Sequence, residues 1–367
     1  MVVKGKGYVV GEPGSILLVQ LGDIGDVVLS LPCIRALREH FPRAPLALAV
    51  RDKAATLFDD CPWVDDVIAI GTPPHGLVAS LRHQMEFLRR LRSFRCELAM
   101  DLRTGTRGAI MAWLSGARQR IGFHARGETF WRNWLFTDLY RPEPVPKIHM
   151  TDYLQNFLTA YGIGVRHTVP ELPVADARQV AVQRLLREAG VAAGMPVVAV
   201  QPFSLWRYKE VPRTTIVEVL RFLRQKNLAV VVVGSAGERE RAEALVRESG
   251  PGASNLAGKT NLLELAALLQ SSALFIGVDS AGLHLAAAVG APTVGIFGPS
   301  AAHCWAPRGE RHLVVQKDLP CVPCHQKGCD GSEHSRCLDA LTVEEITAAV
   351  TRQFEGVAGC RATGSAC

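Results

Sequence analysis

The stretch Val278–Ser300, VDSAGLHLAAAVGAPTVGIFGPS, decides the fold class of this chain. It reads as the end of an apolar strand, a polar turn, an alanine-rich helix and a second buried strand. The turn Asp279–Gly282 opens the helix, so unpaired backbone N–H groups and the positive end of the helix dipole lie there. We therefore expect an α/β unit with a place for an anion, such as a diphosphate, at this turn.

The same alternation of apolar strands and amphipathic helices extends outward from this stretch in both directions. It predicts two doubly wound, Rossmann-like α/β domains in tandem, facing a central cleft, with the extended segment Val169–Val174 as linker. We place the domains at residues 1–172 and 173–340, followed by a C-terminal helix and tail at 341–367. The predicted strands are Ser15–Leu21, Leu46–Val50, Asp66–Ile70, Leu98–Leu102, Pro196–Gln201, Ala229–Val233, Ala273–Val278 and Thr293–Phe297. Gly122–Pro146 reads as irregular.

Composition narrows the function classes. The chain has 367 residues, 48% of them hydrophobic, and a net charge of +6, which is too weak and dispersed to predict nucleic-acid binding but suits an acidic acceptor or an anionic membrane surface. No apolar run approaches the roughly 20 residues that span a bilayer. We expect a cytoplasmic protein without a transmembrane segment, able to lie at an anionic membrane surface. Neither glycine loop reads G-x-G-x-x-G, which disfavours a dehydrogenase.

Three segments in this order resemble glycosyltransferase family 9, the ADP-heptose:lipopolysaccharide heptosyltransferases: LGDIGDVVLSLPCIRALREHFP at 21–42, SGARQRIGF at 115–123 and the run from Leu256 to Pro299. The DSA turn, with HMTDYL at 149–154, is similar to the heptosyltransferase III subgroup. The resemblance implies the GT-B architecture and inverting, metal-independent transfer without a cofactor. Its implied partners are ADP-heptose as donor and, as acceptor, the lipopolysaccharide inner core at the cytoplasmic face of the inner membrane. Ala281, Gly282 and the run Lys209–Pro212 depart from the common family pattern, which bears on donor preference.

Two residues are the catalytic candidates. Asp26 follows a glycine loop at a helix start, and an inverting transfer needs a base for the acceptor hydroxyl; the resemblance puts the catalytic carboxylate here, while the alternative is a helix cap. Lys209 follows the strand Pro196–Gln201, and the resemblance gives it the role of stabilising the departing diphosphate. The alternative for Lys209 is a solvated surface side chain.

Most of the donor-binding candidates lie in the turn Asp279–Gly282 and the residue after it. Backbone amides and the Ser280 hydroxyl are expected to hold the diphosphate, although a plain N-cap is compatible with the same residues. Glu238 follows a strand and is expected either to bind ribose hydroxyls or to sit in a first helical turn. The full set is Ser204, Glu238, Asp279, Ser280, Ala281, Gly282 and Leu283.

The acceptor-binding candidates are Gly25, which lies beside Asp26, and the arginines Arg103 and Arg120. Arginine forks match the carboxylates and phosphates of an inner-core acceptor. The alternative for each arginine is a solvated surface side chain. The basic helix Leu81–Phe94 has two interpretations. We favour an outer helix of the domain with a charged solvent face, and the alternative is a helix that lies on anionic lipid.

Cys321, Cys324, Cys329 and Cys337 have the spacing C-x2-C-x4-C-x7-C, which permits a zinc or iron–sulfur site. We expect no bound metal and no catalytic role for them. Two further functions stay open on the sequence: transfer from another nucleotide sugar, and a sugar-nucleotide-binding protein without catalysis.

Overall fold

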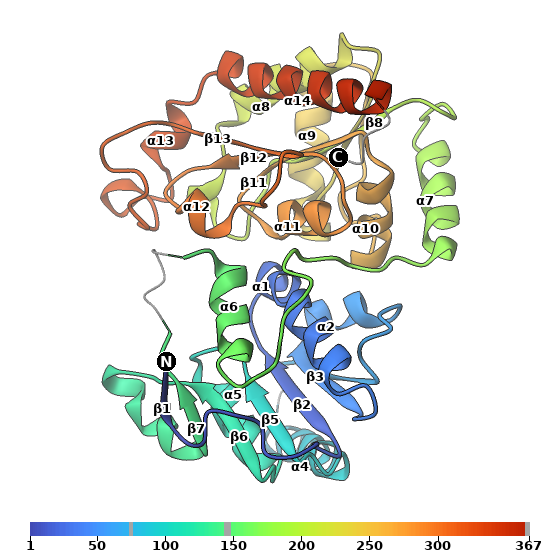
Figure 1. Ribbon diagram of the computed structural model, residues 1–367. Coiled ribbons are helices and arrows are strands. Elements are labelled where there is room, and N and C mark those ends of the chain that lie inside the picture. The colour runs from blue at the N-terminus through green and yellow to red at the C-terminus, as the bar shows by residue number, and fades with distance from the viewer. Residues whose placement is uncertain (73–75, 143–147, 364–367) are drawn as a thin grey trace. The chain divides into compact units, whose positions relative to one another are not determined.

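The computed structural model describes residues 1–72, 76–142 and 148–363, and the chain divides into two compact units, Met1–Pro170 and Glu171–Cys367 (Figure 1). The extended segment Val169–Val174, at which the sequence placed the linker, lies at this division and has no regular secondary structure. Each unit is built around its own sheet.

Unit 1 contains a seven-stranded sheet whose strands are parallel except for the edge strand β1. Six of its strands have the order 3-2-1-4-5-6 typical of a Rossmann domain, and β1 extends the sheet beside the sixth. Across the sheet the strands are β1 (Val2–Lys4), β7 (Asp138–Tyr140), β6 (Gln119–Phe123), β5 (Leu98–Asp101), β2 (Ile16–Gln20), β3 (Leu46–Arg51) and β4 (Asp66–Ile70).

Helices cover both faces of this sheet. Leu17 and Val19 of β2 pack in one core cluster with residues of α4 and α5, while α2 and α6 lie against each other on the opposite face (Figure 1). The helices are α1 (Ile24–Leu29), α2 (Leu31–His40), α3 (Asp52–Ala55), η1 (Thr56–Phe58), α4 (Leu77–Ser93), α5 (Thr106–Leu114), η2 (Gly127–Leu135) and α6 (Met150–Thr159).

Two features of unit 1 differ from the sequence prediction. The single helix expected from Asp26 is two helices, because the chain breaks at Ser30 and restarts with Pro32 in the first turn of α2. The described part of Gly122–Pro146, residues 122–142, is not wholly irregular, since it contains η2 and β7, and residues 143–146 lie outside the described ranges. The neighbouring strand β6 was not predicted, because polar residues interrupt its apolar pattern. Gln119 and Arg120 are accommodated in this strand because their side chains donate to backbone carbonyls, such as those of Tyr8 and Leu135.

Unit 2 contains a six-stranded, fully parallel sheet that again has the Rossmann order. Across the sheet the strands are β10 (Ala253–Asn255), β9 (Ala229–Val232), β8 (Val197–Gln201), β11 (Leu274–Val278), β12 (Thr293–Phe297) and β13 (His312–Gln316). Near-continuous runs of buried valine, isoleucine and leucine form the inner strands, as expected for a parallel sheet with both faces covered.

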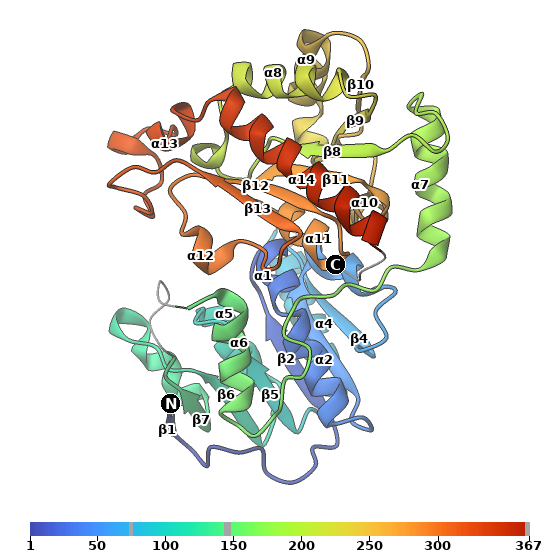
Figure 2. The same cartoon turned by 45° about the horizontal axis from the view of Figure 1, so that its top comes forward.

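The helices of unit 2 complete its two layers. The C-terminal helix α14 lies against α8, β12 and β13 (Figure 2), and α7, which the sequence did not predict, packs against α10. The elements are α7 (Asp176–Glu188), η3 (Arg207–Lys209), α8 (Arg213–Arg224), η4 (Ala236–Glu238), α9 (Arg239–Ser249), α10 (Leu262–Ser271), α11 (Ala281–Ala288), α12 (Ala302–Trp305), η5 (Cys329–Gly331), α13 (Arg336–Asp339) and α14 (Val343–Thr363). Within the described ranges, none of the helices has the length and apolar character needed to cross a bilayer.

Candidate active site

Each sheet has one point where its strand order reverses. In unit 1 this point lies between β2 and β5, and in unit 2 it lies between β8 and β11. Loops that leave the carboxyl ends of two such neighbouring strands run in opposite directions, and the space between them is where doubly wound domains bind ligands. The predicted catalytic and binding residues fall largely on the loops that follow these four strands.

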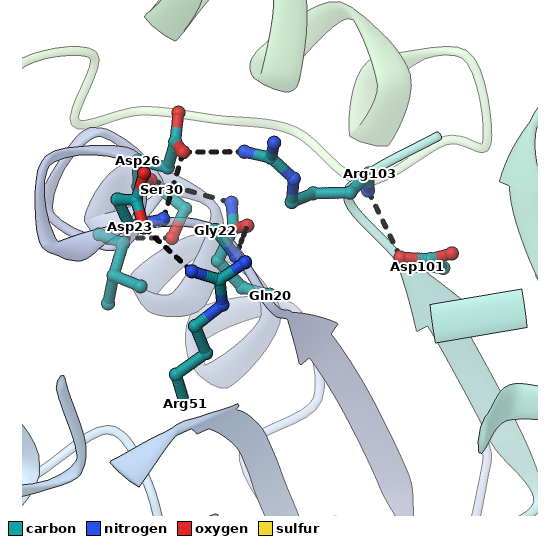
Figure 3. A network of polar contacts seen from close by, with 9 residues as sticks. Gln20, Gly22, Asp23, Asp26, Ser30, Arg51, Asp101 and Arg103 are labelled. Atoms are coloured by element: carbon teal, nitrogen blue, oxygen red, sulfur yellow. Dashed lines mark hydrogen bonds and ion pairs between the residues drawn. The ribbon is translucent and has the colours of Figure 1, made fainter. Parts of the chain in front are cut away.

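The loop after β2 presents Asp26 from the first turn of α1. Asp23 caps this helix, and its backbone N–H donates to Asp26 Oδ2 at 3.0 Å, which closes a capping box. Arg103, on the loop after β5, donates from Nη1 to the same oxygen at 2.5 Å (Figure 3). Asp26 therefore caps the helix and also carries an ion pair that bridges the reversal point. In the described part of the chain, no hydrogen bond reaches its Oδ1.

Gly22 allows this close approach. A Cβ atom at residue 22 would lie 2.5 Å from Asp26 Cβ and 2.7 Å from Arg103 Nη1. The other carboxylate of the loop is turned elsewhere, because Asp23 Oδ1 accepts from Arg51 Nη1 at 2.8 Å (Figure 3). The Asp23 side chain is 57% exposed, compared with 18% for Asp26. The structure thus distinguishes the two acidic residues that share the motif.

A buried ion pair holds the backbone of Arg103. The Arg103 N–H donates to Asp101 Oδ1 at 3.1 Å, and its carbonyl accepts from Arg132 Nη2 at 3.0 Å. Arg132 also bonds Asp101 Oδ2 at 3.0 Å, and both residues are fully buried. Burial raises the pKa of Asp101 to about 7, while the Arg132 guanidinium acts in the opposite direction. Neither residue was predicted, although Asp101 lies in the predicted strand Leu98–Leu102, two residues before Arg103.

Of the other two acceptor candidates, only Gly25 lies beside Asp26. Gly25 lies in the first turn of α1 beside Asp26. Arg120 is not brought to this group, because it lies near the start of β6, two residues before the level at which Gly122 pairs with Asp101. Its guanidinium bonds the carbonyls of Leu135 and Ala117, each at 2.7 Å. Arg120 therefore supports the backbone, and we do not include it in the site.

The reversal point of unit 2 carries a second ion pair. Lys209 Nζ, from the loop after β8, donates to Asp279 Oδ2 at 2.6 Å, and Asp279 directly follows β11. The Asp279 side chain is 7% exposed and that of Lys209 is 21% exposed. This pair orients Lys209 over the turn that begins α11, where its partly exposed ammonium can also meet an anion.

The turn that begins α11 contains unused polar atoms. Ser280 is the N-cap residue, yet its hydroxyl makes no cap bond, and in the described residues this buried oxygen has no hydrogen-bond partner. A buried polar atom of this kind calls for a ligand or a water. Ala281 and Gly282 follow with first-turn N–H groups, whereas the Leu283 N–H donates to Ser280 O at 3.2 Å. A side chain at Gly282 would overlap Gln201 Oε1.

The remaining donor candidates, Ser204 and Glu238, form hydrogen bonds within their own loops. The Ser204 N–H donates to Glu210 Oε1 at 3.0 Å, and Glu210 is ion-paired with Arg241, so Ser204 belongs to a braced loop. Glu238 closes a capping box, since its Oε2 accepts from the Ser235 N–H at 2.6 Å. One carboxylate oxygen of Glu238 is thus engaged in the first helical turn, which was the predicted alternative to ribose binding.

The four clustered cysteines are free thiols, with Cys321 exposed and Cys337 buried. Over residues 1–72, 76–142 and 148–363, no three histidine, cysteine or acidic side chains are arranged to hold a metal ion.

Two Rossmann-like domains in tandem are the architecture of the GT-B fold, which a solved glycosyltransferase structure of family 9 shares with this chain. A model of glycosyltransferase family 9 (heptosyltransferase) matches residues 84–334, and the chain belongs to that family. This assignment agrees with the resemblance that the sequence motifs showed.

Individual relatives agree with the family. Lipopolysaccharide heptosyltransferase 3 of Escherichia coli is 28% identical over 292 residues, which cover 77% of this chain and 83% of that protein. A glycosyltransferase of family 9 from Veillonella parvula superposes with a TM-score of 0.80 at 18% identity, over 96% of this chain and 100% of the other. The Escherichia coli heptosyltransferase WaaC with ADP gives a TM-score of 0.73 at 17% identity, over 92% and 99%. These two structures share the fold.

Proposed function

We propose that this glycosyltransferase moves heptose from ADP-heptose to the inner core of lipopolysaccharide, with inversion at the anomeric carbon and without a metal ion. The observation that carries the proposal is the pair of ionic contacts at the two reversal points, Asp26–Arg103 and Lys209–Asp279. One presents a carboxylate and the other an ammonium, which are the two charges that such a transfer requires.

Asp26 is the proposed base. The acceptor hydroxyl attacks the anomeric carbon, its proton passes to Asp26, and the bond from that carbon to the diphosphate oxygen breaks. Asp26 is suited to this because one oxygen is anchored by the Asp23 N–H and Arg103, while Oδ1 is outside those contacts. The anchored carboxylate does not need to be reoriented when the acceptor binds.

The donor diphosphate is assigned to the start of α11. The N–H groups of Ala281 and Gly282, the unpartnered Ser280 hydroxyl and the positive end of the helix dipole all favour a bound anion. Lys209 stabilises the charge that develops on the leaving diphosphate, which is the work a metal ion does in other transferases. The heptosyltransferase WaaC was determined with ADP, which supports a nucleoside diphosphate as the leaving group.

Arg103 is assigned to the acceptor. Its side chain is 43% exposed and only Nη1 is engaged by Asp26, so the rest of the guanidinium can bind a carboxylate or phosphate of an inner-core sugar. The relatives named lipopolysaccharide heptosyltransferase support this acceptor class.

The test supplies ADP-heptose and a core acceptor and measures release of ADP. We expect Asp26→Asn to lower kcat by about 10²–10⁴-fold, since it removes the general base. Asp23→Asn is the matched control from the same loop, and we expect it to keep most of the activity because Asp23 faces Arg51. Equal losses in the two variants would refute the assignment of Asp26.

The same assay, with the release of either ADP or UDP measured, separates the two alternatives. Turnover with UDP-sugars but not with ADP-heptose would indicate a transferase for another nucleotide sugar. Binding of ADP-heptose without turnover, in the unchanged chain supplied with acceptor, would indicate a binding protein without catalysis.

A further inference from the structure

One side of unit 1 exposes an unusual number of large apolar side chains. The helix α5 lies between α4 and η2 and contacts both of them. These three elements carry eight large hydrophobic residues that are 38% to 81% exposed: Val78, Leu81, Met85, Ile110, Trp113, Phe130, Trp131 and Trp134. We call this the α4–α5–η2 surface. Folded chains seldom leave so much apolar area in water without a partner that covers it.

The helical geometry groups the exposed side chains within each element. Ile110 and Trp113 are three residues apart on α5, and Trp131 and Trp134 are three apart on the 3-10 segment η2, so each pair points to one side. Leu81, Met85 and Ile110 line a pocket of about 800 Å³ between α4 and α5. The deeper residue Leu91 is 1% exposed and belongs to the core. In the C-terminal half of α4 only Leu91 is buried, while Phe87 and Leu88 are half-buried, whereas the N-terminal half presents apolar residues to solvent.

The charge around this surface is strongly basic. The exposed arginines on α4, α5 and η2 are Arg82, Arg89, Arg90, Arg92 and Arg107, with Arg118 and Arg126 on adjoining segments, whereas the acidic residues on the three elements are Glu86 and Glu128. Arg90 pairs with Asp66 on β4, but no ion pair in the described residues involves Arg82 or Arg89. The surface thus combines tryptophan, aliphatic and arginine side chains.

We propose that the α4–α5–η2 surface docks unit 1 onto an anionic lipid bilayer. Tryptophan rings favour the depth of the headgroups, the aliphatic side chains reach the acyl boundary, and the arginines meet lipid phosphates. A second copy of the chain fits less well, because a two-fold interface would place the same arginines against one another. The alternative interpretation of Leu81–Phe94, that it lies on anionic lipid, now has the support of two neighbouring elements.

This proposal does not depend on the sugar that is transferred. Binding is measured on the whole chain without donor or acceptor, by flotation with vesicles of phosphatidylethanolamine and phosphatidylglycerol. We expect the chain to float with these vesicles, to bind vesicles of phosphatidylcholine alone weakly, and to detach as salt is raised. Asp26→Asn should float like the unchanged chain, so a failure of the proposed chemistry is distinguishable from a failure of this proposal.

Two double variants test the two contributions. Arg82→Gln with Arg89→Gln should weaken vesicle binding on the order of 20-fold, since each arginine near an anionic leaflet contributes about five-fold. Trp113→Ser with Trp134→Ser should lower the bound fraction at every lipid concentration and leave the salt dependence in place. The controls lie on α7 of unit 2, where Arg184→Gln with Arg187→Gln changes two exposed arginines and, separately, Val180→Ser changes an exposed apolar residue.

Three outcomes would overturn the proposal. The first is unchanged vesicle binding in both double variants. The second is an equal loss in the α7 controls. The third is a chain that ignores vesicles but forms a dimer which the tryptophan variant dissociates, as measured by light scattering, because that result assigns the surface to a second copy.

Discussion

Gly22 shows how closely packed the residues around Asp26 are. Replacing it with alanine puts a methyl group within 2.7 Å of both Asp26 and Arg103 Nη1, so the carboxylate and the guanidinium must separate. We expect Gly22→Ala to lower kcat about 10²-fold, because displacing a reacting group by about 1 Å has an effect of that size. ADP release under saturating substrates is the measurement.

The control for this prediction is on the neighbouring loop. Gly105 has an extended backbone and no atom within 4 Å of an added Cβ, so Gly105→Ala should leave kcat nearly unchanged. An equal effect of both substitutions would mean that loop flexibility, rather than the position of Asp26, limits the rate.

Lys209 and Asp279 form a pair in which one partner is well buried. Lys209→Met leaves the Asp279 carboxylate unpaired and should lower both turnover and stability, the latter by about 3–5 kcal/mol. The double variant Lys209→Met with Asp279→Asn removes both charges, so it should recover stability while turnover stays about 10²–10³-fold low. Urea unfolding and ADP release measure the two effects. A double variant with normal turnover would exclude Lys209 from leaving-group stabilisation.

At the scale of elements, the edge strand β13 carries a pH-dependent contact. His312 pairs in register with Thr293 of β12, and its Nδ1 lies 3.0 Å from Thr293 Oγ1. Burial, together with the nearby charge of Arg311, lowers the pKa of His312 to about 4. The folded state therefore favours the neutral ring, and its stability falls as pH drops from 6.5 toward 4, where the unfolded chain takes up the proton first.

His312→Gln removes this titration. Between pH 7 and pH 4.5, we expect the free energy of unfolding of the unchanged chain to fall by about 1–3 kcal/mol more than that of the variant. Urea unfolding of unit 2 measures both values. A difference independent of pH would show that His312 is not held neutral. Comparing the two chains at each pH cancels the carboxylates that titrate over the same range.

Element boundaries in the sequence were predictable where the periodicity is strong. Asp66–Ile70 and Thr293–Phe297 are strands with the predicted bounds. The helices α5 and α7 were missed, and the expected helix from Asp26 breaks at Ser30. The spacing of apolar residues does not reveal that a new helix begins near Pro32, because α1 and α2 continue the same apolar face.

For the whole molecule, the two compact units imply that ligands protect separate parts of the chain. ADP alone should slow hydrogen exchange in the loops after β8 and β11 of unit 2 and leave the Gly22–Asp26 loop of unit 1 unaffected. At about 100 times its Kd, ADP should stabilise unit 2 by about 2.7 kcal/mol. Protection confined to unit 1 would reverse the assignment of donor and acceptor sites.

The sequence alone determined the class of this protein. Alternating apolar strands and amphipathic helices, a linker near residue 170 and the turn before α11 predicted two Rossmann-like domains, and the ordered motifs predicted the family. These properties depend on spacing within short segments, where side-chain periodicity is set by the local backbone.

Which charged groups meet depends on the tertiary structure. Asp26 and Arg103 are 77 residues apart and Lys209 and Asp279 are 70 apart, and each pair forms because strand order places the two loops together at a reversal point. The same order leaves Arg120 near the opposite end of its strand and supports Arg103 with the buried Asp101–Arg132 pair. No local pattern contains this information, since it depends on which strands lie side by side in the sheet.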